Sequence, residues 1–351
     1  MRLLFLLTLL MIAGCSVKTP EPEAIEEIVL AGGKASKWPE KLSSFGFFQK
    51  PLQALRPEKG VVAYQINAPL FSDYAFKKRF VKVPTNEPAT FNERETMDFK
   101  EGTILIKNFY YPADFRKPEG KRRIIETRLL VREASQWEAL TYLWTEDQEE
   151  AYFTSSGATV KATWIDDSGL KQSVDYLVPN QNQCKSCHQQ KGKLVPIGPT
   201  ARQLNMTEEG GQQLLRLVNQ GVLDSVPNPE TIPALANYHN LTESTERRAR
   251  AWLEGNCAHC HRPEGPGKTS GLHLMAEVHK PLALGIGKAP VAAGKGSGGL
   301  QYDVLPGRPE SSILLYRILS TDPGVMMPEL GRTIVDREGA ALIEQWIREM
   351  R

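Results

Sequence analysis

The stretch Pro179-Asn-Gln-Asn-Gln-Cys184-Lys-Ser-Cys187-His188 separates two parts of the chain with different sequence patterns. Before it, runs of strand-forming residues alternate with turn signals, as in residues 103–111, 123–131 and 158–178. After it, helical periodicities are separated by loops rich in Gly and Pro. We therefore predict a multidomain protein, β and then α. A β-rich domain of sandwich or barrel type over residues 41–180 precedes a mainly α-helical region.

The Cys-x-x-Cys-His motif at residues 184–188 recurs as Cys257-Ala-His-Cys260-His261. Two thiols three positions apart can reach both vinyl groups along one edge of a haem, and the next residue can ligate the iron from below. The sequence thus predicts two covalently attached c-type haems and a dihaem cytochrome c region. The attachment residues are Cys184, Cys187, Cys257 and Cys260, and the iron ligands are His188 and His261.

Other roles for these cysteines fit less well. A zinc site needs four converging ligands, whereas the two pairs are 73 positions apart and each is followed directly by His. A thioredoxin-like pair should lie near a βαβ pattern, and neither motif does. A disulfide across so short a span would be strained. The fifth cysteine is Cys15, so we expect no structural disulfide.

The second haem module is predicted over residues 244–351. A helix capped by Ser244 or Thr242 leads into the motif, and Asp336 can cap a terminal helix with a broad apolar face. Met327 precedes Pro328, as the iron-ligating Met does in many cytochromes c, so we predict Met327 as the sixth ligand. The alternatives are Met326 and a second imidazole, from His273 or His279. His259, inside the motif, is expected to be solvated.

The first haem module, residues 181–243, contains no Met-Pro pair after its motif. Its sixth ligand is therefore open. The candidates are Met206, His239, Met97 from the β-rich domain, or a vacant position. A six-coordinate haem passes electrons, whereas a five-coordinate haem can also bind a small ligand.

The first 15 residues predict export. Arg2 and the apolar run 3–13 form a signal peptide that is too short to span a bilayer, and the run ends in Ile-Ala-Gly-Cys15. This ending resembles a bacterial lipobox. We expect residues 1–14 to be removed and Cys15 to be lipidated, with residues 15–40 as a tether. Ser16 then favours a periplasm-facing lipoprotein of the outer membrane in a Gram-negative host.

The composition is that of a folded protein: 351 residues, 41% hydrophobic and 24% charged, with a net charge of +2. A charge so close to zero gives no reason to expect a nucleic-acid partner.

Several stretches resemble an uncharacterised family of bacterial exported dihaem c-type cytochromes. They are residues 68–75 (APLFSDYA), 102–107 (GTILIK), 126–128 (ETR), 183–188 (QCKSCH), 248–253 (RARAWL), 256–261 (NCAHCH), 306–307 (PG) and 326–331 (MMPELG). The resemblance implies haem binding and electron transfer from about residue 40 to the C-terminus, and it implies no particular substrate.

The leading functional prediction is a membrane-anchored electron carrier whose redox partners are an exported dehydrogenase or oxidase. The main alternative is a dihaem peroxidase-like or other redox enzyme that uses an open site on the first haem. A third is a binding protein whose β-rich domain holds a ligand. The sequence predicts no catalytic residue.

Overall fold

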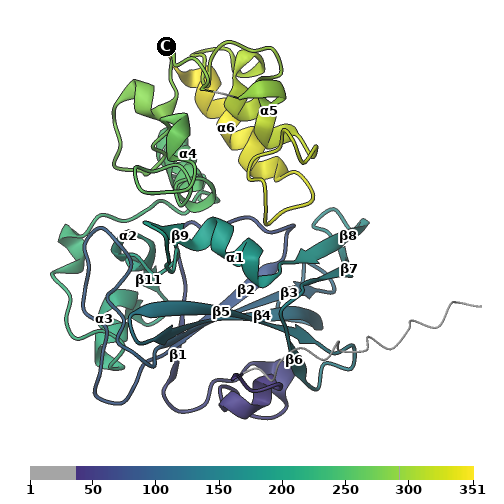
Figure 1. The fold of residues 1–351 in the computed structure, drawn as a ribbon, viewed down its shortest axis with the longest axis vertical. Coiled ribbons are helices and arrows are strands. Elements are labelled where there is room, and N and C mark those ends of the chain that lie inside the picture. The colour runs from purple at the N-terminus through teal and green to yellow at the C-terminus, as the bar shows by residue number, and fades with distance from the viewer. Residues whose placement is uncertain (1–36, 292) are drawn as a thin grey trace, which may run out of the picture. The chain divides into compact units, whose positions relative to one another are not determined.

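A computed structural model describes residues 37–291 and 293–351 of the chain (Figure 1). Residues 39–351 form one compact unit. The expected signal peptide at residues 1–14, the lipidated Cys15 and most of the expected tether lie outside the described residues. Within the described ranges, no helix combines the length and the apolar character needed to cross a membrane.

The main element is an open, six-stranded antiparallel sheet in which neighbouring strands follow one another along the chain. Long runs of β-branched and aromatic residues favour these strands. In spatial order they are β1 (Val61–Tyr64), β2 (Phe76–Lys82), β3 (Ile104–Pro112), β4 (Arg122–Glu133), β5 (Gln136–Trp144) and β6 (Ala151–Thr154).

One side of this sheet, which we call the aromatic face, packs on residues 42–55. Two 3₁₀ turns lie in that segment, η1 (Leu42–Phe45) and η2 (Leu52–Ala54). The Phe45 ring meets Tyr142 of β5 edge-on at 5.7 Å between centroids, and Phe48 meets Phe80 of β2 at 5.1 Å. Edge-to-face aromatic pairs of this kind add to the stabilisation from burial.

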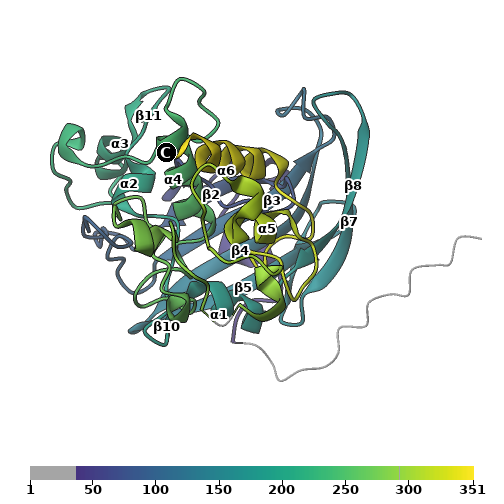
Figure 2. The ribbon, with the colours of Figure 1, turned by 90° about the horizontal axis from the view of Figure 1, so that it is seen from above.

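The other side, which we call the helix face, is covered in three sections (Figure 2). The hairpin β7 (Ala158–Ile165) and β8 (Lys171–Val178) covers one end, with Trp164 stacked on Tyr111. The short helices α2 (Ala201–Leu204) and α3 (Gln213–Asn219) cover the other end and pack on Leu105. Between them lies α1 (Gln181–His188). Two-residue strands flank these helices: β9 (Gln189–Gln190) with β10 (Lys193–Leu194), and β11 (Thr207–Glu208) with β12 (Gly211–Gln212).

The C-terminal part is built on α4 (Thr245–Asn256), α5 (Ile313–Leu319) and α6 (Arg337–Glu349). These helices share a core around Trp252 and Ile343. Ser244 caps α4 by accepting a hydrogen bond from the Arg247 N–H, and Asp336 caps α6 in the same way.

The predicted fold class is wrong. The protein is β-rich, and the described residues contain six α-helices of at most 13 residues and no large helical cytochrome region. Between Asn256 and Ile313 the described residues contain no α-helix, only the 3₁₀ turns η4 (Lys268–Ser270), η5 (Pro281–Leu284), η6 (Gly294–Ser297) and η7 (Pro309–Ser311); η3 (Pro229–Thr231) lies earlier. Gly and Pro recur through residues 263–309, and both disfavour helix interiors, so the helical patterns extend over only a few turns.

Candidate functional site

The second Cys-x-x-Cys-His motif forms a tight turn at the end of α4. The N–H groups of Cys260 and His261 both donate to the Cys257 carbonyl oxygen, at 3.1 and 2.9 Å. The loop that follows returns against this turn, and the Gly267 N–H donates to the Cys260 carbonyl oxygen at 3.0 Å. A Cβ at Gly265 would collide with the same carbonyl, so the return path requires glycine there. Both thiols and the imidazole thereby face one space.

That space is a cavity of about 650 Å³, lined by Cys257, Cys260, His261 and Met327 together with apolar side chains. Leu272, Leu274, Ile313 and Ile318 are among the apolar lining residues. Cys187 and His259 also line this cavity. Within it, Cys257, Cys260, His261 and Met327 together supply the donor set of a c-type haem with His and Met as axial ligands.

Hydrogen bonds fix the tautomer of His261. Its Nδ1 lies 3.0 Å from the Ser270 hydroxyl oxygen, and that hydroxyl donates its only proton to the Gly267 carbonyl oxygen at 2.7 Å. Nδ1 must therefore carry the hydrogen, which leaves the lone pair of Nε2 free to bind a metal. Burial lowers the pKa of His261 to about 4, which also favours the neutral ring.

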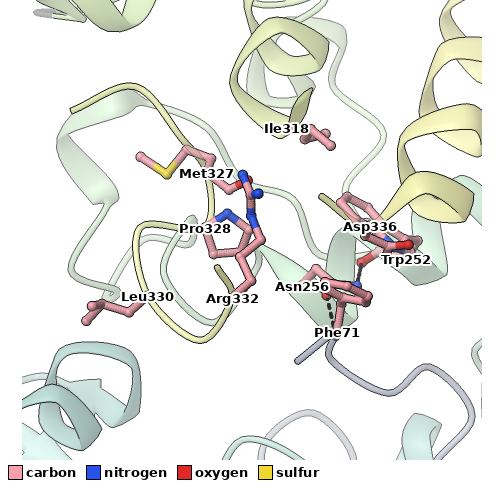
Figure 3. A pocket seen from close by; sticks show the side chains of 9 residues that line it. All are labelled: Phe71, Trp252, Asn256, Ile318, Met327, Pro328, Leu330, Arg332 and Asp336. Carbon is pink, nitrogen blue, oxygen red and sulfur yellow. Dashed lines mark hydrogen bonds between the residues drawn. The ribbon is translucent and has the colours of Figure 1, made fainter. Parts of the chain in front are cut away.

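Met327 lines the cavity, whereas Met326 is buried in the protein and does not. The Met327 backbone is held at both ends, because its N–H donates to the Arg317 carbonyl oxygen at 3.0 Å and its own carbonyl accepts from Arg332 at 2.9 Å. Figure 3 shows Met327, Pro328 and Arg332 on one side of a small adjoining pocket. His273 and His279, the other candidates for this iron, are not among the lining residues of the cavity.

The first motif lies on α1, whose start is set by a reciprocal capping box between Asn180 and Gln183. The Cys184 thiol points at the helix face of the sheet, where it is hydrogen-bonded to the Thr141 hydroxyl, and burial raises its pKa. The His188 Nδ1 donates to the Val195 carbonyl oxygen at 2.8 Å, since a carbonyl can only accept. His188 therefore also has a free Nε2, and burial lowers its pKa to about 4.

The two motifs touch. The thiols of Cys187 and Cys260 are hydrogen-bonded to each other, and donation from Cys260 holds the pKa of Cys187 below its usual value while raising that of Cys260. His259 also donates to Cys187, and it lines both the large cavity and a smaller one of about 70 Å³ beside it. The expectation that His259 is simply solvated is wrong: its Nδ1 is buried and has no partner among the described residues.

The candidates for the sixth position of the first haem lie elsewhere. Met97 is 2% exposed in the core beside Tyr64 and Val81. His239 is at the surface, 3.2 Å from a Glu338 carboxylate oxygen. Met206 is half-buried immediately before β11. The sixth ligand of the first haem therefore stays open.

A zinc site is not supported. Among the described residues, which include all four cysteines of the motifs, no group of three or more His, Cys, Asp or Glu side chains could hold a metal ion. Those four cysteines are free thiols. Attachment of a haem has a smaller requirement, because it uses only two thiols and one axial imidazole from each motif.

No protein-family model, curated protein or solved structure matches the chain. The predicted membership of a family of exported dihaem cytochromes is therefore wrong: no family model matches, and the described part is mostly β, with little helix and no metal-binding cluster.

Proposed function

We propose that the protein is a dihaem c-type cytochrome that carries electrons. In this proposal Cys184 and Cys187 hold one haem and Cys257 and Cys260 the other, with His188 and His261 as proximal ligands. The observation that carries the proposal is that Cys257, Cys260, His261 and Met327 line one cavity of about 650 Å³.

The iron of a bound haem supplies one-electron redox chemistry. The residues of the chain supply the iron ligands and the surroundings of each haem. The two imidazoles are neutral and present Nε2 in advance, so ligation requires neither deprotonation nor a change of tautomer. Leu272, Leu274 and Ile318 give the second site an apolar part of its wall, and a Met ligand would raise the reduction potential relative to a second His.

The contact between Cys187 and Cys260 supports electron transfer within the protein. In the haem-bound protein Cys187 and Cys260 would each form a thioether to the edge of one haem, so the proximity of these two cysteines would bring the two haem edges together. His259 lies at this junction, between the two attachment sites.

The proposed setting is the periplasmic side of a membrane. Export by residues 1–14 and lipidation of Cys15 would hold the protein to a membrane, the outer one in a Gram-negative host. Its partners would be an exported dehydrogenase or oxidase, with no role for nucleic acid.

Intact-protein mass spectrometry of the full chain, produced in a host with a haem-attachment system, tests the proposal. We expect a mass increase of two haems. Cys184→Ser with Cys187→Ser should remove one haem, and Cys257→Ser with Cys260→Ser should remove the other. Ser186→Ala, inside the first motif, is the matched control and should retain both haems. A wild-type protein with four free thiols and no haem would refute the proposal.

An enzymatic role for the first haem is the second candidate, because Met97 is buried in a core cluster and His239 lies at the surface beside Glu338, which leaves the sixth position of this haem open. Low-temperature electron paramagnetic resonance of the oxidised protein separates the two roles. A high-spin signal from the haem on Cys184 and Cys187 would favour an enzyme with an open site. Two low-spin signals would favour a carrier.

A further inference from the structure

Three cations stand in a row across the helix face of the sheet. The strand register pairs Arg79 of β2 with Lys107 of β3, and Lys107 with Arg128 of β4. Residues that face each other across antiparallel strands have their Cβ atoms about 4.5–5.5 Å apart, and like charges at such positions are destabilising. Lys77, two residues before Arg79, adds a fourth cation to the same face of β2. We call Arg79, Lys107, Arg128 and Lys77 the cationic row.

Only one member of the row is neutralised by a carboxylate. Arg128 pairs with Glu126, whose carboxylate also accepts a hydrogen bond from Tyr176. Lys77 donates to the uncharged Leu70 carbonyl oxygen at 3.0 Å. Arg79 has a buried Nη2 with no hydrogen-bond partner among the described residues. Among the described residues, Arg79, Lys107 and Lys77 form no ion pair. The row therefore contains three cations without a carboxylate partner.

Enclosed cations without a counter-charge are costly, because removal of an ion from water is compensated only by an opposite charge or by several hydrogen bonds. Burial lowers the pKa of Lys77 to about 7 and also lowers the pKa of Lys107 and Arg79. An anionic ligand that lies along the row would remove this penalty. Two carboxylates could pair with Arg79 and Lys107, which face each other across β2 and β3, with Lys77 beside them.

The position of the first haem motif indicates which carboxylates these are. Cys184 is hydrogen-bonded to Thr141, which the register places directly opposite Arg128, at the β5 end of the row. Because strands lie about 4.8 Å apart, Lys107 is about 10 Å and Arg79 about 14 Å from Thr141 along the row. In haem, the vinyl groups that bond to cysteine and the two propionates lie on opposite edges of the ring. A ring attached at Cys184 that lies along the row would carry its propionates toward β3 and β2.

We propose that Arg79 and Lys107, with Lys77 beside them, bind the propionate carboxylates of the haem attached at Cys184 and Cys187. The inference rests on the proposed function, since it requires a haem at that motif. It identifies the helix face of the β-sheet as one wall of the first haem site.

The test compares Arg79→Gln and Lys107→Gln with Lys78→Gln, which removes a cation from the aromatic face of the same strand. All three holoproteins should carry two haems by mass. A nearby cation stabilises the reduced, more electron-rich haem, so its removal lowers the potential. We expect Arg79→Gln and Lys107→Gln each to lower the reduction equilibrium constant of the first haem at least tenfold, which is about 59 mV for one electron. Lys78→Gln and the charge-conserving Arg79→Lys should change it less than threefold.

The first haem is assigned as the one whose potential is unchanged by Met327→Ala. Resonance Raman spectra give a second readout, because the propionate bending mode shifts when hydrogen bonds to these carboxylates are lost. An unchanged potential and unchanged Raman mode in Arg79→Gln, with two haems present, would overturn this inference and leave the proposed function intact. If the potential of the first haem changed only on addition of acetate or phosphate, the cationic row would bind a free anion. That result would also overturn the inference. A protein with no haem would refute the proposed function first.

Discussion

Asp73→Ala would remove a side chain that holds the C-terminal part against the rest of the protein. The Asp73 side chain lies just before β2 and is 2% exposed. Its carboxylate accepts hydrogen bonds from the Thr333 N–H at 2.7 Å, the Thr333 hydroxyl at 3.0 Å and the Ile334 N–H at 3.1 Å. These partners lie between Met327 and α6, about 260 positions away in the sequence.

The expected cost follows from those contacts. A hydrogen bond to a charged group contributes about 1.5–3 kcal/mol, and a buried donor left without a partner costs about 1–3 kcal/mol. Alanine also removes an unfavourable term, because burial of the carboxylate raises the pKa of Asp73 above its model-compound value of 3.8. With three bonds lost and this partial compensation, we expect Asp73→Ala to lower the free energy of unfolding by about 2–4 kcal/mol.

Asp73→Asn is the matched control. Its amide oxygen can still accept from both N–H groups, and its NH₂ can donate to the Thr333 hydroxyl oxygen, so all three contacts remain without the charge. We expect a change within about 1 kcal/mol at neutral pH. The raised pKa also fixes the direction of the pH dependence. As the pH rises above 3.8, ionisation of Asp73 lowers the free energy of unfolding of the wild type. The stability of Asp73→Asn should therefore increase relative to the wild type over that range.

Urea unfolding followed by tryptophan fluorescence measures these differences, and the long-wavelength iron–thioether band of the holoprotein reports on the nearby Met327. Asp73→Ala should weaken that band. The reasoning would be refuted if Asp73→Ala were as stable as the wild type. It would also be refuted if Asp73→Asn were as unstable as Asp73→Ala, since charge rather than hydrogen bonding would then hold the segment.

Three further experiments test separate parts of the structure. Met327→Ala should abolish the iron–thioether band while Met326→Ala preserves it, as seen by absorbance spectroscopy; the reverse result would assign the ligand to Met326. Gly255→Ala should lower the free energy of unfolding in urea by about 1–3 kcal/mol, because the added Cβ would lie 2.5 Å from a backbone oxygen of a neighbouring loop. The Asp166 carboxyl should titrate at about 2 by NMR, since the Ser168 hydroxyl and its turn stabilise the charged form, so its contribution to hairpin stability should be lost as the pH falls from 3.8 towards 2. An ordinary value near 3.8 would contradict the hydrogen bonds of that turn.

Local signals in the sequence located several elements well. Ser244 and Asp336 were predicted as helix caps, and they begin α4 and α6. Residues 158–178, predicted as strand-forming runs with turn signals, form the antiparallel pair β7 and β8. These features depend on residues within a few positions of each other, where capping and turn chemistry decide the conformation.

The features that need distant contacts could not be predicted. The cationic row exists only because the register sets Arg79 opposite Lys107 and Lys107 opposite Arg128, and no local pattern fixes that register. The contact between Cys187 and Cys260 depends on how α1 packs against the C-terminal part, which contains α4. The fold class was wrong because apolar periodicity indicates where a helix can form, while Gly and Pro determine how far it extends.

The order of strands in the sheet has a consequence for how the protein assembles. Every strand from β1 to β6 is paired with the strand next to it in the chain, so the sheet closes only loops of modest length. The bonds from Asp73 to Thr333 and Ile334 close much longer loops, of 260 and 261 positions, and long loops are slower to close. We therefore expect the sheet to fold first and the C-terminal part to dock last, an order that pulsed hydrogen exchange would reveal. Until that docking, Cys187 and Cys260 would stay apart, so under the proposed function each motif would remain open to the machinery that attaches haem.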